Sequence, residues 1–224
     1  MEYKSGKFDL EKYLELKTIS ERLKYVRAAD TKEPAQFQQL GLGSSRVVYR
    51  LPQIGKVIKL AINKAGIDQN KEEIKATRKI HQIMPEYPIV TKIFGHDDIN
   101  NPTWLISEAV SQVEDESEIE DMAGVPIRVF YQIVMHGLED TTETAKRKRF
   151  ADAEVLNVLQ NPSPLLKAVS MIHELGLDAG DLTFEDHWGV TADHRLVALD
   201  YGFPRSVADK YNAYDIDNEY MKPF

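Results

Sequence analysis

The sequence of 224 residues contains no cysteine, so disulfides, thiolate metal sites and cysteine nucleophiles are excluded. This absence fits a reducing compartment. The chain also has fewer basic than acidic residues, 28 Lys and Arg compared with 36 Asp and Glu, which gives a net charge of −8. Binding to a nucleic-acid backbone requires a basic surface, so we expect no such partner.

A long apolar run is missing as well. The most apolar stretch, Val125 to Leu138, is interrupted by three polar residues and is too short to span a bilayer. The first residues, Met1 to Lys4, are charged and lack the apolar core of a signal peptide. Because 42% of the chain is hydrophobic, it can build a real core. We therefore expect a soluble, cytoplasmic, globular protein that binds no membrane.

Hydrophobic periodicity predicts an α+β fold. Helices are expected at about 9–29, at 70–84, ending before Pro85, and from Ser163 as N-cap to Gly176. Strands are expected at 40–49, 56–62, 89–94 and 103–110, with a hairpin at 188–202. Residues 111–150 carry half of the net charge, and their acidic and basic runs are interpreted as solvated surface. Within that segment, 127–134 is either a buried helix or a buried strand.

Two glycines, Gly41 and Gly43, lie in a small-residue turn at the start of the first predicted strand segment, 40–49. Glycine lets a backbone approach a polyphosphate closely enough for its N–H groups to donate hydrogen bonds. An ordinary hairpin turn explains the same pair of glycines.

Lys59 interrupts the apolar run of the second predicted strand. It either faces outward, as strand alternation permits, or points at phosphate oxygens and is held by a carboxylate. Glu73 is the better partner, because it shares a helical stripe with Thr77 and Ile80, whereas Glu72 lies on a more polar stripe. A capping pattern that starts at Asn70 also explains Glu73 unaided.

Two aspartates, Asp181 and Asp200, are further candidate functional residues. Asp181 follows the predicted third helix, and Asp200 comes nineteen residues later, after the apolar end of the hairpin. A carboxylate at the mouth of a hairpin can reach a metal bound to phosphates, and a second can accept a hydroxyl proton. Each aspartate alone is equally typical of a turn or cap.

In this order, the four elements resemble the protein-kinase-like fold from about Gly41 to Gly202. The sequence is most similar to small kinase-like proteins of bacteriophages and mobile elements. The similarity is carried by Leu-Gly-x-Gly-Ser-Ser-Arg-x-Val-Tyr at 40–49, Gln-Asn-x-x-Glu at 69–73 and Gly-Asp-Leu…Trp-Gly…Leu-Asp-Tyr-Gly at 180–202.

The resemblance implies a two-lobed fold with an N-terminal helical extension at 1–34, an N-lobe at 35–110 and a short C-lobe at 111–224. It implies that ATP is bound by the loop Gly41, Gly43, Ser44, Ser45, Arg46 and Val47, with its adenine near Glu108. Lys59, positioned by Glu73, would hold the α- and β-phosphates. Asp200 would bind Mg²⁺, and Asp181 would take the acceptor proton.

The sequence departs from the kinase pattern in four places. Arg46 replaces the third loop glycine and can contact a phosphate, and Ala179-Gly180 replaces the usual His-Arg. At the second metal position stands either Asp186, an oxygen donor, or His187, a poor ligand for Mg²⁺. Only 22 residues follow Gly202, which truncates the C-lobe.

Two functions fit these features. The first is an ATP- and Mg²⁺-dependent phosphotransferase that acts on a protein Ser or Thr, a host protein among the candidates, or on a small-molecule hydroxyl. The second is a pseudokinase that serves as a binding, virion-associated or host-inhibitory module. For a phage protein, either function places it in the host cytoplasm.

Overall fold

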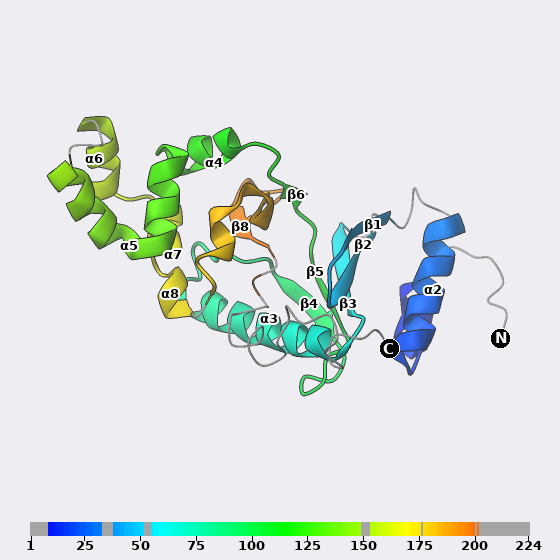
Figure 1. Cartoon of the computed structure of the whole chain (residues 1–224). Helices are drawn as coiled ribbons and strands as arrows, with labels where there is room; N and C mark the ends of the chain where they lie inside the picture. Colours follow the sequence, from blue (N-terminus) through cyan, green and yellow to red (C-terminus); the bar gives the residue numbers. More distant parts are fainter. Residues whose placement is uncertain are drawn as a thin grey trace. The chain divides into compact units, whose positions relative to one another are not determined.

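The computed structural model describes residues 9–32, 38–51, 55–148, 153–175, 177–199 and 201. The described chain mixes helices with a five-stranded and a three-stranded sheet (Figure 1). It divides into two compact units. The first takes the described residues of Met1–Ile74 and Lys92–Ala109, and the second those of Lys75–Thr91 and Val110–Pro204.

The first unit is built on an antiparallel sheet with strand order β1-β2-β3-β5-β4. Its elements are α1 (Leu10–Glu15), α2 (Ile19–Lys32), β1 (Gln38–Leu42), β2 (Arg46–Leu51), β3 (Lys56–Ala61), β4 (Ile93–His96) and β5 (Trp104–Glu108). The helix α3 (Lys64–Ile83) starts in this unit and ends in the second.

Strand register gives the five-stranded sheet two different faces. Val47, Tyr49, Ile58, Leu60 and Ile106 share one face, as their cross-strand pairing requires, and they pack into one apolar cluster with Leu23, Tyr25 and Val26 of α2. The opposite face carries Arg46, Val48, Lys59, Leu105 and Ser107. Three buried polar residues, Arg46, Lys59 and Ser107, thus share the face turned away from α2.

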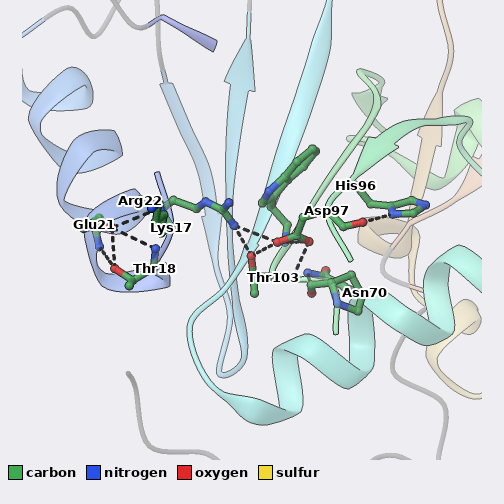
Figure 2. Close-up of polar contacts among 10 residues, drawn as sticks. Lys17, Thr18, Glu21, Arg22, Asn70, His96, Asp97 and Thr103 are labelled. Carbon is green, nitrogen blue, oxygen red and sulfur yellow. Dashed lines mark hydrogen bonds and ion pairs between the residues drawn. The ribbon is translucent and has the colours of Figure 1, made fainter. Parts of the chain in front are cut away.

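A buried arginine ties α2 to the loop between β4 and β5. The Arg22 guanidinium donates to the Asp97 carboxylate at 2.9 Å and also contacts the Thr103 hydroxyl. Asp97 accepts in addition from the Thr103 amide at 2.8 Å. Figure 2 shows Arg22 pointing from its helix into this loop, with Asn70 of α3 on the loop's other side. The Asn70 amide group donates to the Pro102 carbonyl at 3.0 Å, so the loop joins α2 to α3.

The single helix predicted at about 9–29 is wrong, because the chain breaks between α1 and α2. Thr18 and Glu21 form a reciprocal cap at the break. The Glu21 carboxylate accepts from the Thr18 amide at 3.1 Å, and the Thr18 hydroxyl accepts from the Glu21 amide at 3.2 Å. This capping box starts a new helix at Ile19.

The start predicted for α3 at Asn70 is also wrong. The helix begins at Lys64, and its cap is Asn63, whose side chain accepts from the Gly66 amide at 2.9 Å. Asn70 therefore lies inside the helix, fully buried, and the capping interpretation of Asn70 and Glu73 fails.

The second unit consists of short helices around a three-stranded antiparallel sheet, in the order β6-β7-β8. Its elements are β6 (Ser111–Gln112), α4 (Glu116–Ala123), α5 (Ile127–Lys148), α6 (Ala153–Gln160), α7 (Pro164–Ser170), α8 (Ile172–Leu175), the 3₁₀ turns η2 (Asp181–Thr183) and η3 (Glu185–His187), β7 (Trp188–Val190) and β8 (Leu196–Ala198). Gly137, at φ 78°, interrupts α5.

Trp188 lies at the centre of the second unit's core. It is fully buried, and the Phe130 ring of α5 meets it edge-on at 5.2 Å between centroids. Its indole N–H donates to the Leu182 carbonyl at 3.0 Å. Because Leu182 is the middle residue of η2, this bond fixes the turn that begins at Asp181.

Several sequence predictions are confirmed. Ser163 caps α7 with Pro164 at its first position, but the single helix predicted from there to Gly176 is wrong, because α7 ends at Ser170 and α8 follows it. The strands β7 and β8 form the predicted hairpin. The segment 127–134 is helical. The strand predicted at 89–94 is shorter, since only 93–96 forms β4 and Val90 makes an isolated bridge to Ala198. None of the described helices is long and apolar enough to cross a membrane. Gly176, Asp200 and Gly202 lie outside the described residues.

Gly66 tests the contact between α3 and the loop before β2. In most helices, Gly→Ala raises stability by about 0.5–1 kcal/mol. At Gly66, an added Cβ would lie 2.1 Å from the Ser45 carbonyl oxygen, a main-chain atom that cannot rotate away. Gly66→Ala should therefore lower the free energy of unfolding by about 1–3 kcal/mol in urea titrations. Gly95→Ala is the control, because its Cβ would meet only the Trp104 ring at 3.8 Å. Equal stability of the two variants would contradict the close approach.

Candidate functional site

A buried ion pair joins β3 to α3. The Lys59 ammonium lies 2.7 Å from Oε1 of Glu73, and both residues are buried, Glu73 completely. Lys59 is buried although it lies on the sheet face turned away from α2, so the predicted alternative of an outward-facing lysine is wrong. The predicted pairing with Glu73 is confirmed.

Arg46 is a second cation on the same carboxylate. Its guanidinium donates to Oε2 of Glu73 and, at 3.2 Å, to the Asn70 side-chain oxygen. Each oxygen of Glu73 thus binds a different cation, one from β2 and one from β3. The sequence analysis expected Arg46 to contact a phosphate. Its hydrogen bond to Glu73 was not anticipated.

Electrostatics keep the shared carboxylate ionised. Burial alone would raise the pKa of Glu73, but the nearby charges and hydrogen bonds of Lys59 and Arg46 outweigh it and leave that pKa below its ordinary value. A carboxylate held in this way is a fixed anchor for the Lys59 ammonium.

The loop between β1 and β2 is fastened to the start of α3. The Gly43 amide closes the hairpin on the Arg46 carbonyl at 2.9 Å. The Ser44 carbonyl accepts from the Asn63 side chain at 2.8 Å, and the Ser45 hydroxyl donates to the Gln69 side chain. Gly41 and Gly43 leave room around their α-carbons. The predicted phosphate loop is therefore a braced turn in this chain.

Strand register separates Val47 from the other predicted loop residues. Val47 pairs with Leu60 and packs with the α2 cluster, while Val48 pairs with Lys59 on the polar face. The structure therefore brings Val48, not Val47, beside Lys59. To predict which of the two valines lies beside Lys59, one needs the register in which β2 pairs with β3. The sequence does not give that register.

Two residues at the end of β5, Ser107 and Glu108, differ in their hydrogen bonding. Glu108, predicted to lie near adenine, donates its amide to the Lys92 carbonyl at 2.9 Å. The hydroxyl of Ser107, which is fully buried on the Lys59 face, has no hydrogen-bond partner in the described part of the chain. Register places Ser107 opposite Val57, diagonal to Lys59, about 7–8 Å along the sheet. An orphaned buried hydroxyl next to a buried lysine fits a ligand that supplies the missing partner.

The second unit carries the predicted catalytic aspartate. Asp181 opens η2 and is exposed. Its carbonyl contacts Nδ1 of His187, and the neighbouring Gly180 amide donates to the Asp178 carboxylate at 2.9 Å. With Trp188 bound to Leu182, the main chain around Asp181 is braced on both sides.

Of the three predicted metal ligands, the structure describes Asp186 and His187. Asp186 is exposed, and its Oδ1 lies 3.8 Å from Nε2 of His187. The Leu199 amide, one residue before Asp200, donates to the His187 carbonyl at 2.7 Å. Asp200 itself lies outside the described residues. Within the described ranges, no group of three or more His, Asp or Glu side chains is arranged to hold a metal. As a donor set, Asp186 suits Mg²⁺ and His187 does not.

Tyr201, the middle residue of Asp-Tyr-Gly, makes contacts that sequence reasoning missed. Its buried hydroxyl lies 2.7 Å from the Thr77 hydroxyl and 3.4 Å from the Thr91 carbonyl. These partners are more than a hundred residues away along the chain, so no local signal announces them. They anchor the residue that directly follows Asp200.

A scan against protein-family models finds no match, and a search of curated proteins finds none that matches the chain significantly.

Replacement of the Glu73 carboxylate, which Lys59 and Arg46 share, tests its contribution to stability. Glu73→Gln leaves two buried cations without their common anion, so the free energy of unfolding at neutral pH should fall by about 3–5 kcal/mol. Glu72→Gln, one residue earlier and only half-buried, should change it little. Denaturant titrations of both variants measure the difference.

The pH dependence follows from the same carboxylate. Since folding lowers the pKa of Glu73, its stabilising contribution is complete above the unfolded value of about 4.5 and is lost as pH falls through the folded value. The gap in stability between the parent and Glu73→Gln should close in that acidic range. A gap that persists there would contradict an ionised Glu73.

Proposed function

We propose that the chain is an ATP- and Mg²⁺-dependent phosphotransferase with a protein-kinase-like fold. The observation that carries the proposal is the Lys59–Glu73 ion pair, a buried ammonium held at a fixed point on the polar face of a five-stranded sheet. Burying a lysine is costly, and an anionic ligand is a reason to keep it there.

In this proposal, Lys59 holds the α- and β-phosphates of ATP, and Glu73 keeps its ammonium in place. The orphaned Ser107 hydroxyl and the chain near Glu108 lie on the side where the base would bind. The loop from Gly41 to Arg46 covers the phosphates as a braced turn. Fixing these groups in advance lowers the barrier, because phosphoryl transfer depends mainly on positioning and charge.

Asp181 acts on the acceptor hydroxyl, which belongs to a protein Ser or Thr or to a small molecule. As the acceptor oxygen bonds to the γ-phosphorus, the bond from that phosphorus to the β–γ bridging oxygen breaks and ADP leaves. Asp181 orients the hydroxyl and takes its proton. Asp200 would hold a divalent cation, which would supply charge neutralisation on the phosphates.

A second function, a pseudokinase that binds without turnover, has its own support. His187 stands at a metal position and Ala179-Gly180 replace the usual His-Arg. The exposed acidic residues of the segment 111–121 offer a surface to a basic partner. In a phage setting, such a module would be virion-associated or would inhibit a host protein.

A measurement of ATP binding tests the proposed nucleotide site. ATP with Mg²⁺ should raise the thermal unfolding temperature of the parent, and Lys59→Gln should weaken ATP binding at least about tenfold, since a charge-assisted hydrogen bond is lost. Lys56→Gln is the control from the same strand, because Lys56 stacks on the Phe94 ring at 4.0 Å instead. No thermal shift in the parent would remove ATP as a ligand.

Phosphoryl transfer tests the second step. Asp181→Asn should leave ATP binding intact and lower label transfer from γ-labelled ATP, to the chain itself or to a host lysate, by about 10²–10⁴-fold. Asp140→Asn, which changes an exposed side chain of α5, should change neither. ATP binding by the parent without any label transfer would favour the pseudokinase.

A further inference from the structure

The orientation of His187 is fixed by the main chain. Its Nδ1 contacts the Asp181 carbonyl oxygen, and a carbonyl can only accept, so Nδ1 carries the ring proton. With the proton on Nδ1, the lone pair that an imidazole offers to a metal is the one on Nε2. A ligating histidine commonly has this arrangement, with one nitrogen donating to a carbonyl and the other left for a metal.

The lone pair on Nε2 has a carboxylate oxygen beside it. Oδ1 of Asp186 lies 3.8 Å from Nε2, and the two side chains are 63% and 33% exposed, respectively, so an ion can reach them. With metal–ligand bonds of about 2.1 Å, two donors of one ion lie at most about 4.2 Å apart. The observed separation falls within that span.

Further contacts hold the main chain and the ring of His187. The His187 carbonyl accepts from the Leu199 amide at 2.7 Å, and the ring meets Phe184 edge-on at 6.0 Å between centroids. A donor that is held before the ion arrives loses less freedom on binding.

The chemistry of this pair disagrees with Mg²⁺. Mg²⁺ prefers oxygen ligands, whereas imidazole favours borderline transition metals. We propose that Nε2 of His187 and Oδ1 of Asp186 form a divalent-metal position that selects a nitrogen-accepting cation such as Co²⁺ over Mg²⁺. This inference deepens the proposed phosphotransferase, on which its role beside the nucleotide rests.

The test compares two histidines whose Nδ1 each contacts a main-chain carbonyl. In His187→Asn the ring nitrogen is lost, while an oxygen donor remains possible. His96→Asn is the matched control, because Nδ1 of His96 also contacts a main-chain carbonyl, that of Asp97 at 2.8 Å. Dissociation constants for Co²⁺ and for Mg²⁺ are measured by calorimetry on each full-length chain, with and without ADP. Thermal unfolding confirms that each variant folds.

We expect His187→Asn to weaken Co²⁺ binding at least about tenfold and to change Mg²⁺ binding less than about twofold. His96→Asn should change neither. The visible absorption of bound Co²⁺ should also differ between the parent and His187→Asn, because the ligand field of an imidazole nitrogen is lost.

Two results would overturn the proposal. One is an equal loss of Co²⁺ and Mg²⁺ affinity in His187→Asn. The other is a Co²⁺ affinity and spectrum that this variant shares with the parent. If the parent binds no nucleotide, the phosphotransferase fails, and the titrations without ADP still decide whether His187 binds the metal.

Discussion

The carboxylate of Glu73, buried and shared by two cations, is the interaction on which the first unit depends. Lys59 from β3 and Arg46 from β2 each bind one of its oxygens. Removing three ionised side chains from water costs several kcal/mol for each, and only close pairing offsets it. The pairing fixes α3 against two strands at once, and it fixes the ammonium that the proposed chemistry needs. Structure and proposed function therefore rest on the same group.

The motif residues around this carboxylate satisfy one another before they meet any ligand. Ser45 binds Gln69, Asn63 binds the Ser44 carbonyl, and Asn70 lies between Arg46 and the Pro102 carbonyl. Buried polar groups must be paired, so a motif with this many of them is first a requirement of the fold. For this reason, the motif by itself does not distinguish an active phosphotransferase from a pseudokinase. The distinction lies with Asp181 and the metal residues, which belong to the second unit.

Sequence patterns predicted those features that depend on residues close together along the chain. The α+β composition, the Ser163 cap, the hairpin after Trp188 and the choice of Glu73 over Glu72 all follow from periodicity and capping chemistry. The errors have the same origin. Asn70 has the spacing of a cap, but Asn63 caps α3 seven residues earlier, and Thr18 with Glu21 restarts a helix that periodicity alone would continue. Strand register, which separates Val47 from Val48, and the distant partners of Tyr201 depend on tertiary packing, for which a single sequence has no signal.

Asn70 also connects this centre to the first helices. It accepts from Arg46 and donates to Pro102, and the loop that contains Pro102 holds Asp97 and Thr103, the partners of Arg22 on α2 (Figure 2). Arg22 is buried, and α2 also covers the apolar face of the sheet, so the helix contributes both to the core and to a polar network that ends at Glu73. A minimal chain that began at the glycine loop would expose that face and leave Asp97 without its cation. The helix α2 thus helps to hold Lys59 in position.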